Sequence, residues 1–323
     1  MIEATVIIVG GGPAGSTCAR ELKKNGIDAL IIDKHEFPRT KLCAGWITSK
    51  VLADLELAPR DYPHSLLVYR KILFCFKKIP IPVPTRQYSI RRFEFDDFLL
   101  KRADVPVHQH RAKDIRRENN KYIIDDAYKC TYLVGAGGTH CPVHRALFDG
   151  LHPRDPRLCI ATVEEEFAWE CKDSQCRLWF FENNLPGYCW YVPKQEGYLN
   201  VGIGGKLDSL KKRGRTINRH WSLFTEKLSR KNLVKGHNFN PRGHLYYLRG
   251  NTENTRLENA FLIGDAAGLA TRDMGEGIGP AVESGKLAAK AIISGTHFSL
   301  KNVTGWSAPQ ILTSGFAAGR IKI

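Results

Sequence analysis

The N-terminal part of the chain alternates short apolar runs with a segment of helical character. Residues 4–9 are continuously apolar and rich in β-branched side chains, as in a strand buried in a parallel sheet. Residues 16–24 are compatible with a helix that stops at Asn25-Gly26, a common helix C-terminal signal. A second apolar run over residues 29–32 ends in Asp33. This order predicts a strand–helix–strand unit with parallel strands.

The rest of the chain adds a second pattern. Further signals predict a helix over 93–100, a strand over 260–263 and a helix from about 277 to 293. Residues 206–228 predict a covering helix. Several stretches alternate or are rich in β-forming residues and predict an antiparallel sheet: 66–76, 158–169, 176–181, 188–193 and 198–203. No internal repeat or low-complexity linker is present, which agrees with two interdigitated domains.

The first predicted strand leads into the sequence GGGPAG, which matches G-x-G-x-x-G. Gly10 permits the tight turn, Gly12 lets the backbone approach a pyrophosphate, and Gly15 allows close packing of helix on strand. Pro13 is favoured in the first helical turn. Asp33 is placed to accept hydrogen bonds from a ribose. The pattern predicts a dinucleotide site and leaves NAD and FAD both open.

A second glycine-rich segment lies far along the sequence. The short strand ends at Gly264-Asp265, and Asp265 can accept hydrogen bonds from sugar or ribityl hydroxyls. Gly275 and Gly277 precede the last predicted helix, whose N-terminus presents the positive end of the helix dipole. That end would stabilise the negative charge of a reduced flavin.

Composition and charge restrict the class of protein. The 323 residues are 43% hydrophobic and 25% charged, as in ordinary globular proteins, and no apolar run approaches the roughly 18–20 residues that cross a bilayer. Lys and Arg (48) exceed Asp and Glu (33), which gives a net charge of +15. The basic residues form short scattered pairs outside any nucleic-acid-binding motif, so we expect no nucleic-acid partner. An acidic or phosphorylated ligand or an anionic membrane surface fits better than nucleic acid, and plain solubility also accounts for the charge.

The nine cysteines lack the spacing of a metal site. They contain no Cys-x-x-Cys pair, and the closest two, Cys171 and Cys176, have no histidine companion. We therefore expect free thiols and no metal.

Three further segments accompany the two glycine-rich turns. Residues 41–45 read KLCAG, residues 188–194 read YCWYVPK, and residues 274–278 read MGEGI. Together with the turns they resemble the K-x-C-G-G, Y-x-W-x-F-P and G-E-G-I motifs of the geranylgeranyl reductase family of FAD-dependent oxidoreductases. This family has the p-hydroxybenzoate-hydroxylase-type flavoprotein fold. The resemblance extends from residue 5 to about residue 295.

The sequence departs from the family pattern at a few positions. Ala44 replaces a glycine and Val192 replaces a phenylalanine. In the middle motif of the fold, Gly137 replaces an aspartate and Cys141 a serine. The tail after about residue 296 is short.

The resemblance implies an α/β fold. A Rossmann-like FAD-binding domain, with a parallel sheet flanked by helices, is expected to be interdigitated with an antiparallel-sheet substrate domain. The expected boundaries are 1–60, 86–155 and 255–323 for the FAD-binding domain and 61–85 and 156–254 for the substrate domain.

The resemblance also implies site residues. Cys43 would lie near the flavin ring, where a thiol can orient substrate or relay a proton. Tyr188 and Trp190 would line an apolar pocket, and with Cys43 they are the predicted catalytic residues. The predicted FAD contacts are Gly10, Gly12, Pro13, Ala14, Gly15, Asp33, Lys34, Lys41, Cys43, Ala44, Gly45, Arg92, Gly264, Asp265, Gly275, Gly277 and Ile278.

The activity that the resemblance implies is reduction of carbon–carbon double bonds in an isoprenoid or other apolar substrate, by hydride transfer from reduced FAD. NAD(P)H or a protein donor would supply the electrons. Two alternatives stay open, because one fold hosts several chemistries: a flavin-dependent monooxygenase or halogenase, and a non-catalytic flavin-binding redox module. We expect a cytoplasmic location, with peripheral contact to the inner face of a membrane as a further option.

Overall fold

The structure is a computed structural model that describes residues 1–64, 66–76 and 79–317. It divides into two compact units, each built from separated stretches of chain, as the interdigitated fold class predicts. Unit 1 comprises Met1–Arg39, Phe93–Asp155 and Tyr247–Ser307. Unit 2 comprises Thr40–Arg92, Pro156–Tyr246 and the chain from Ala308 on.

The division differs in detail from the boundaries expected from the sequence. Residues 40–60 and 86–92 group with unit 2, whereas the sequence interpretation placed them with the nucleotide-binding segments. Residues 247–254 group with unit 1, and residues 308–317, which were expected in the FAD-binding domain, group with unit 2. The segment that carries the KLCAG motif therefore belongs to the unit that contains the antiparallel sheet.

Unit 1 is built on a largely parallel sheet with strand order β15-β16-β9-β1-β2-β6. The pairs from β16 to β6 are parallel, and β15 is antiparallel to β16. A hairpin of β7 (Ile115–Glu118) and β8 (Lys121–Ile124) pairs antiparallel with β9. The other bounds are β1 (Ile2–Val9), β2 (Ala29–Asp33), β6 (Val107–Gln109), β9 (Tyr128–Gly135), β15 (Arg256–Leu257) and β16 (Ala260–Leu262).

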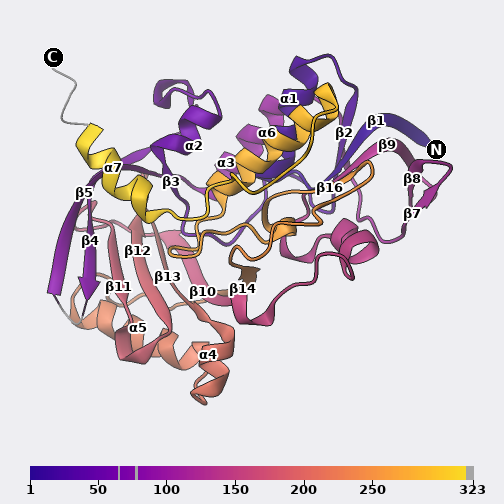
Figure 1. Cartoon of the computed structure of the whole chain (residues 1–323). Coiled ribbons are helices and arrows are strands. Elements are labelled where there is room, and N and C mark those ends of the chain that lie inside the picture. Colours follow the sequence, from indigo (N-terminus) through magenta and orange to yellow (C-terminus); the bar gives the residue numbers. More distant parts are fainter. Residues whose placement is uncertain (65, 77–78, 318–323) are drawn as a thin grey trace. The chain divides into compact units, whose positions relative to one another are not determined.

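Three helices accompany this sheet: α1 (Pro13–Lys24), α3 (Arg92–Ala103) and α6 (Ile278–Ser294). Figure 1 shows α1 and α6 side by side. Their close approach requires Gly285, because a Cβ there would lie 2.5 Å from the carbonyl oxygen of Ala14. The strands in the middle of the sheet are fully buried, with Ile7, Ile8 and Ile31 at 0% exposure, as the continuous apolar runs predict.

Unit 2 contains a second sheet with strand order β14-β10-β13-β12-β11-β4-β5-β3. Neighbouring strands are antiparallel from β10 to β11 and from β4 to β3, while β11 and β4 are parallel. The bounds are β3 (Trp46–Thr48), β4 (Leu67–Phe76), β5 (Ile79–Ser89), β10 (Cys159–Ala168), β11 (Arg177–Phe180), β12 (Gly187–Pro193), β13 (Tyr198–Lys206) and β14 (Arg242–Tyr247).

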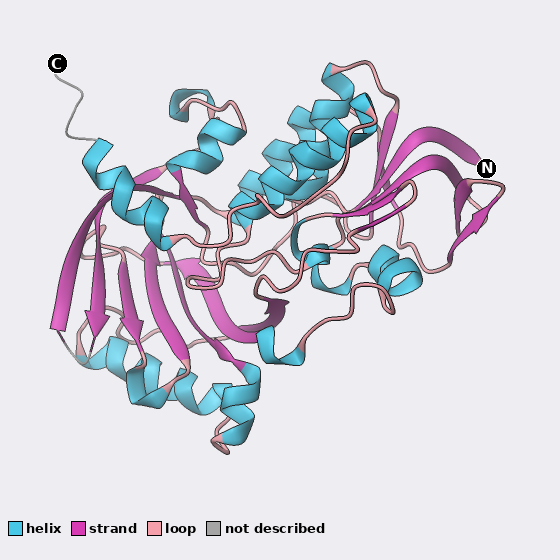
Figure 2. Cartoon of the chain, viewed as in Figure 1, coloured by secondary structure: helices cyan, strands magenta, loops and turns pink. Residues whose placement is uncertain are grey.

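Helices cover one face of this sheet (Figure 2). The side chains of Trp221, Phe224 and Leu228 on α5 (Ile217–Arg230) belong to one apolar cluster with inward residues of the strands, among them Tyr191 and Val201. The single helix expected over 206–228 is instead α4 (Leu207–Lys212) followed by α5, because Gly214 adopts a positive φ of 59° between them. The smaller helices are α2 (Ser49–Asp54) and α7 (Ala308–Ala317).

No helix within residues 1–64, 66–76 and 79–317 is both long and apolar enough to span a bilayer.

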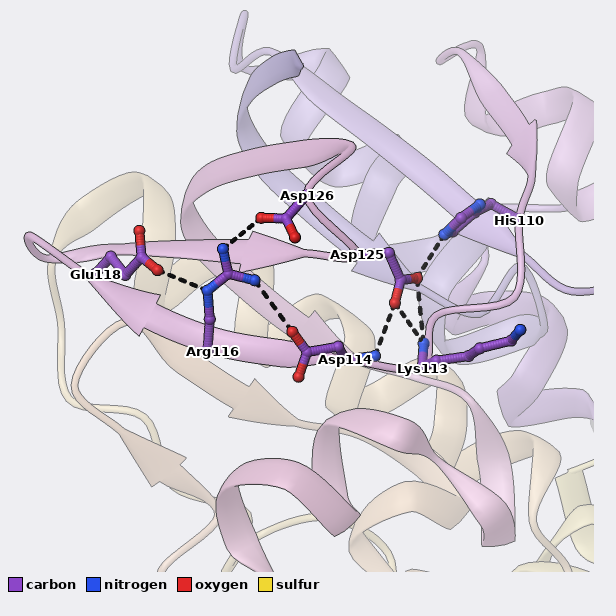
Figure 3. Close-up of polar contacts among 7 residues, drawn as sticks. All are labelled: His110, Lys113, Asp114, Arg116, Glu118, Asp125 and Asp126. Carbon is purple, nitrogen blue, oxygen red and sulfur yellow. Dashed lines mark hydrogen bonds and ion pairs between the residues drawn. The ribbon is translucent and has the colours of Figure 1, made fainter.

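A polar cluster fixes the β7–β8 hairpin of unit 1 (Figure 3). The carboxylate of Asp125 accepts hydrogen bonds from the backbone N–H groups of Asp114 at 2.7 Å and Lys113 at 3.1 Å, and lies 2.6 Å from Nε2 of His110. Burial alone would raise the pKa of Asp125, but these bonds together lower it. Asp126 instead makes an exposed ion pair with Arg116.

We predict that Asp125→Ala destabilises the protein by about 1–3 kcal/mol, because it leaves backbone donors without their acceptor. The matched change Asp126→Ala should cost less than about 1 kcal/mol, since its ion pair is solvent-exposed. Because the pKa of Asp125 is lowered in the folded state, its contribution is present at neutral pH and is lost as pH falls through that pKa. Urea unfolding of both variants at neutral and acidic pH measures this. Equal effects of the two substitutions would contradict it.

Candidate functional site

The first glycine-rich turn joins β1 to α1 in unit 1. Gly10 has a φ of 116°, and a Cβ there would lie 2.4 Å from the carbonyl oxygen of Ala136, the residue that follows β9. Position 15 also accepts only glycine, since a Cβ there would lie 1.9 Å from the carbonyl oxygen of Gly10. Gly12 is the N-cap of α1 and Pro13 the first helical residue. The turn therefore leaves the N-terminus of α1 without a side chain over it, which suits an anionic phosphate.

Two side chains border this turn. Asp33, at the end of β2, accepts hydrogen bonds from the backbone N–H of Gly11 at 2.8 Å and of His35 at 2.9 Å. It is 8% exposed, and each carboxylate oxygen has a further lone pair for a ribose hydroxyl. Arg39 lies beside Gly12, because Nη2 would be 3.6 Å from a Cβ built there. Its guanidinium also lies 3.4 Å from the buried carboxylate of Asp96.

The second glycine-rich turn follows β16. Gly264 has a φ of 57° and donates its N–H to Oγ of Ser284 on α6 at 2.9 Å. The guanidinium of Arg154 donates to the backbone carbonyls of Asp265 and Ala266, at 3.3 and 3.1 Å, and so fixes the turn from outside.

The two turns meet within unit 1. A Cβ built on Gly264 would lie 3.0 Å from the Cβ of Ala14, so the second turn touches the first turn of α1. Oδ1 of Asp265 would lie 3.2 Å from a Cβ on Gly277, the N-cap of α6. The N-terminal ends of two helices and two carboxylates therefore converge, with glycine wherever a side chain would fill the space. This arrangement fits a dinucleotide.

The N-terminus of α6 carries one group that sequence reasoning missed. Glu276 is half-buried, and its carboxylate accepts a hydrogen bond from the backbone N–H of Gly279. Burial raises its pKa to about 7. Its backbone is tied to Thr271, whose N–H donates to the Glu276 carbonyl at 2.9 Å.

In unit 2, the segment 41–45 is held in place by two buried side chains. The ammonium of Lys194 donates to the carbonyls of Ala44, Gly45 at 3.1 Å and Ile90 at 2.8 Å. Nδ2 of Asn200 donates to the Cys43 carbonyl at 3.3 Å. Gly45 has a φ of 62°, and a Cβ there would lie 2.5 Å from the Lys194 nitrogen. The lysine that ends the YCWYVPK motif thus positions the KLCAG motif.

Asn200 also joins this segment to Trp190. Its Oδ1 accepts a hydrogen bond from the Trp190 indole N–H at 2.7 Å. The indole ring lies over Gly202, where a Cβ would come within 2.2 Å of it. The Tyr188 ring lies next, with its centroid 5.8 Å from the Trp190 ring.

Glu164 is a buried carboxyl group on the same face of the unit 2 sheet as Trp190. It is directly opposite Gly202, which in turn is opposite Trp190. The residue is 3% exposed, and its Oε2 has no hydrogen-bond partner among the described residues. Burial raises its pKa to about 8, although Lys194, Lys41 and Arg92 act in the opposite direction. Glu164 is therefore largely a neutral carboxylic acid at pH 7.

The structure sorts the predicted site residues into two sets. In unit 1 it brings together the two turns and the α6 N-terminus, and Lys34 follows Asp33 as an exposed residue. In unit 2 it brings Cys43, Ala44 and Gly45 to Trp190 through Asn200, while Nζ of Lys41 lies 2.8 Å from Nε2 of His244. Arg92 is buried at the start of α3. Residues 1–64, 66–76 and 79–317 contain no group of three potential metal ligands.

Sequence reasoning assigned no role to five polar residues of these sites: Arg39, Glu164, Lys194, Asn200 and Glu276. Lys194 and Glu276 carried a signal, because they lie within the YCWYVPK and MGEGI motifs. Glu164 and Asn200 lie in segments predicted to be strands, but their roles depend on the register of those strands, and Arg39 lies in a loop without a motif.

Solved structures share this fold. A geranylgeranyl bacteriochlorophyll reductase-like protein of Thermoplasma acidophilum superposes with a TM-score of 0.79 at 22% identity, over 99% of this chain and 84% of that chain. A flavin-dependent brominase superposes with a TM-score of 0.73 at 20% identity, over 98% and 83%.

Sequence comparison gives the family. A model described as an FAD binding domain matches residues 3–53. Digeranylgeranylglycerophospholipid reductase 3 of Methanosphaera stadtmanae is 29% identical over 90% of this chain and 78% of its own length. A menaquinone reductase of Mycolicibacterium smegmatis is 26% identical over 98% and 82%. An uncharacterised protein of Methanosarcina barkeri is 30% identical over 91% and 76%. The chain belongs to the geranylgeranyl reductase family.

This membership confirms the predicted cofactor and enzyme class. The geranylgeranyl reductase family protein described here is an FAD-dependent oxidoreductase. The non-catalytic alternative is therefore set aside.

We predict that Gly15→Ala prevents stable folding, since its Cβ would overlap the Gly10 carbonyl. Gly12→Ala should fold, because the nearest atom to its Cβ is 3.6 Å away, but it should bind FAD about tenfold or more weakly by blocking the approach of the pyrophosphate. Gly150→Ala, which meets nothing within 4 Å, is the control. FAD content and thermal melting measure both effects. Full FAD affinity of Gly12→Ala would refute this assignment.

We also predict that Glu164→Gln flattens the pH dependence of stability. The pKa of about 8 in the folded state exceeds the usual glutamate value of 4.5, so Glu164 stabilises the fold most at low pH. Its contribution falls by up to about 1.4 kcal/mol per pH unit between those values. Wild type should thus lose stability relative to the variant from about pH 5 to pH 8. Chemical denaturation at several pH values measures the difference, and parallel curves would exclude a protonated Glu164.

Proposed function

We propose that this oxidoreductase reduces carbon–carbon double bonds of an isoprenoid chain that binds along the face of the unit 2 sheet opposite to the one that packs against α5. The relatives named as digeranylgeranylglycerophospholipid reductase and menaquinone reductase support a prenyl-bearing substrate. Their identity of less than 30% leaves the particular prenyl compound to experiment.

The observation that carries the proposal is a continuous apolar track on this face. Two rows of directly paired residues cross the sheet: Gly202, Trp190, Leu178, Phe74 and Ile81 form one, and Gly204, Tyr188, Phe180, Phe76 and Ile79 the other. The Phe180 ring stacks on Phe76 at 4.8 Å and Phe74 at 5.6 Å, and lies 5.3 Å from Tyr188. A row of apolar and aromatic side chains suits an extended branched hydrocarbon.

The polar residues at the inner end of the track suit this ligand. Because burial raises its pKa to about 8, Glu164 is mostly protonated at neutral pH, so the row that begins at Gly202 lies next to a largely neutral carboxyl group. Both polar atoms of the Asn200 amide form hydrogen bonds: Oδ1 accepts from the Trp190 indole, and Nδ2 donates to the Cys43 carbonyl. The thiol of Cys43 is partly exposed and accepts a hydrogen bond from the Gly45 N–H at 3.4 Å. We propose that Cys43, Tyr188 and Trp190 contact the substrate.

For the cofactor, we propose that Gly12, Ala14 and Gly15 bind the FAD pyrophosphate with help from Arg39. Asp33 and Asp265 would accept hydrogen bonds from its hydroxyls. When bound and reduced, FAD would supply a hydride to one alkene carbon and a proton from water or a side chain would add to the other, so that two C–H bonds form and the double bond becomes a single bond. The residues around Lys194 keep segment 41–45 rigid, which preserves the orientation of Cys43 and excludes water from its backbone.

A flavin-dependent halogenase is the second candidate, since the brominase shares the fold. Reduction of a double bond needs no oxygen, whereas hydroxylation and halogenation consume it. The test is anaerobic incubation of the FAD-loaded protein with a chemical reductant and either digeranylgeranylglycerophospholipid or menaquinone. After any quinol formed by the reductant has been reoxidised in air, we expect a product heavier by one H2 per reduced isoprenoid double bond in mass spectrometry, and no such product without the protein. An unchanged substrate without oxygen, and a hydroxylated or halogenated product with it, would contradict the reductase proposal.

Trp190→Phe tests the track. It removes the indole N–H that Asn200 accepts, so we expect kcat/KM to fall roughly tenfold, equivalent to about 1.4 kcal/mol. The control is Trp179→Phe, whose ring lies on the opposite, helix-covered face in contact with Phe224. It should lower thermal stability and leave kcat/KM nearly unchanged. A loss of kcat/KM in Trp179→Phe but not in Trp190→Phe would contradict substrate binding along the track.

A further inference from the structure

One end of the unit 2 sheet exposes large apolar side chains. Phe181 is 64% exposed, Ile79 65%, Ile81 46% and Phe76 38%. We call these four residues the apolar end. Phe76 and Phe180 end the parallel strands β4 and β11, so Phe181, which follows β11, lies at the same edge of the sheet.

The apolar end is continuous with the track described above. Ile79 pairs with Phe76, and Phe76 pairs with Phe180, whose ring lies 6.2 Å from Phe181. Exposed apolar surface of this extent on a soluble domain usually marks a contact with a partner or a membrane.

The edge strand argues against a protein partner that adds a strand. Residues 79–84 of β5 pair with β4 only, since β3 pairs with β5 at residues 87–89. This free edge carries Pro80, Pro82 and Pro84, which have no N–H to donate. Alternating prolines block strand addition by a second copy or by a peptide.

Positive charge borders the apolar end. The guanidinium of Arg213 donates to the Asn184 carbonyl at 2.6 Å, and that of Arg215 to the Asn183 carbonyl at 2.8 Å, which holds both beside the loop that follows Phe181. Neither forms an ion pair with a carboxylate of the described chain, and both are exposed. The one acidic residue of this loop, Glu182, is paired with Lys227 at 2.6 Å.

We propose that the apolar end is a docking surface for an anionic lipid bilayer. Phe181, Ile79, Ile81 and Phe76 enter the headgroup region, and Arg213 and Arg215 bind lipid phosphates. The surface delivers an apolar chain directly to the start of the track. It does not depend on which reaction the enzyme performs, and binding is measured without substrate or reductant, so its failure is distinguishable from failure of the proposed function.

The experiment is flotation of the FAD-loaded protein with vesicles of phosphatidylcholine alone and of phosphatidylcholine with phosphatidylglycerol. We expect stronger binding to the anionic vesicles, and weaker binding as salt rises. The double variant Ile79→Ser/Ile81→Ser should bind about tenfold or more weakly. Phe181→Asn should weaken binding as well, and it should fold, because φ at this residue is 57° and asparagine tolerates that region.

Matched control variants test whether vesicle binding depends on the apolar end or on exposed apolar and basic residues in general. Leu151→Ser removes a side chain of unit 1 that is 46% exposed, and it should bind as wild type. Arg213→Gln/Arg215→Gln should remove most of the salt dependence, whereas the exposed Arg145→Gln should not. Equal binding of wild type and Ile79→Ser/Ile81→Ser, or no binding to either vesicle, would overturn the proposal. A concentration-dependent dimer that the apolar variants abolish would also overturn it, since the end would then be a protein interface.

Discussion

The proposed cofactor site depends on a close backbone approach that only glycine permits. The turn after β1 and the turn after β16 are far apart in sequence, yet Gly264 contacts Ala14 at the start of α1. α6 reaches the same place because Gly285 lets it lie against the carbonyl of Ala14. These contacts bring two helix N-termini and two carboxylates to one location, where fixed dipoles can stabilise an anionic ligand without reorganisation.

Unit 2 uses buried polar groups in a different way. Lys194 is buried, which lowers its pKa, and its hydrogen bonds go to backbone carbonyls of segments that would otherwise be loose. Asn200 ties the same segment to Trp190. A buried lysine is costly unless its donors are satisfied, and here its hydrogen bonds fix the conformation of residues 44 and 45.

The sequence allowed the parallel unit and both glycine-rich turns to be predicted, because they depend on local patterns: apolar runs, glycine spacing and an acid at a strand end. β5 was missed, since Pro80, Pro82 and Pro84 resemble a non-strand segment and are tolerated only because that edge is free. Glu164 was missed because its role arises from strand register, which places it opposite Gly202 and within reach of Trp190. Pairings between distant strands leave no short-range signal.

We propose that the two distant turns form a single FAD site. This can be tested by hydrogen–deuterium exchange of the apoprotein with and without saturating FAD. If both turns bind one FAD molecule, FAD will slow amide exchange in residues 10–15 and in residues 264–279 together, with the same dependence on FAD concentration. Slower exchange in only one of these segments, or in neither, would contradict it.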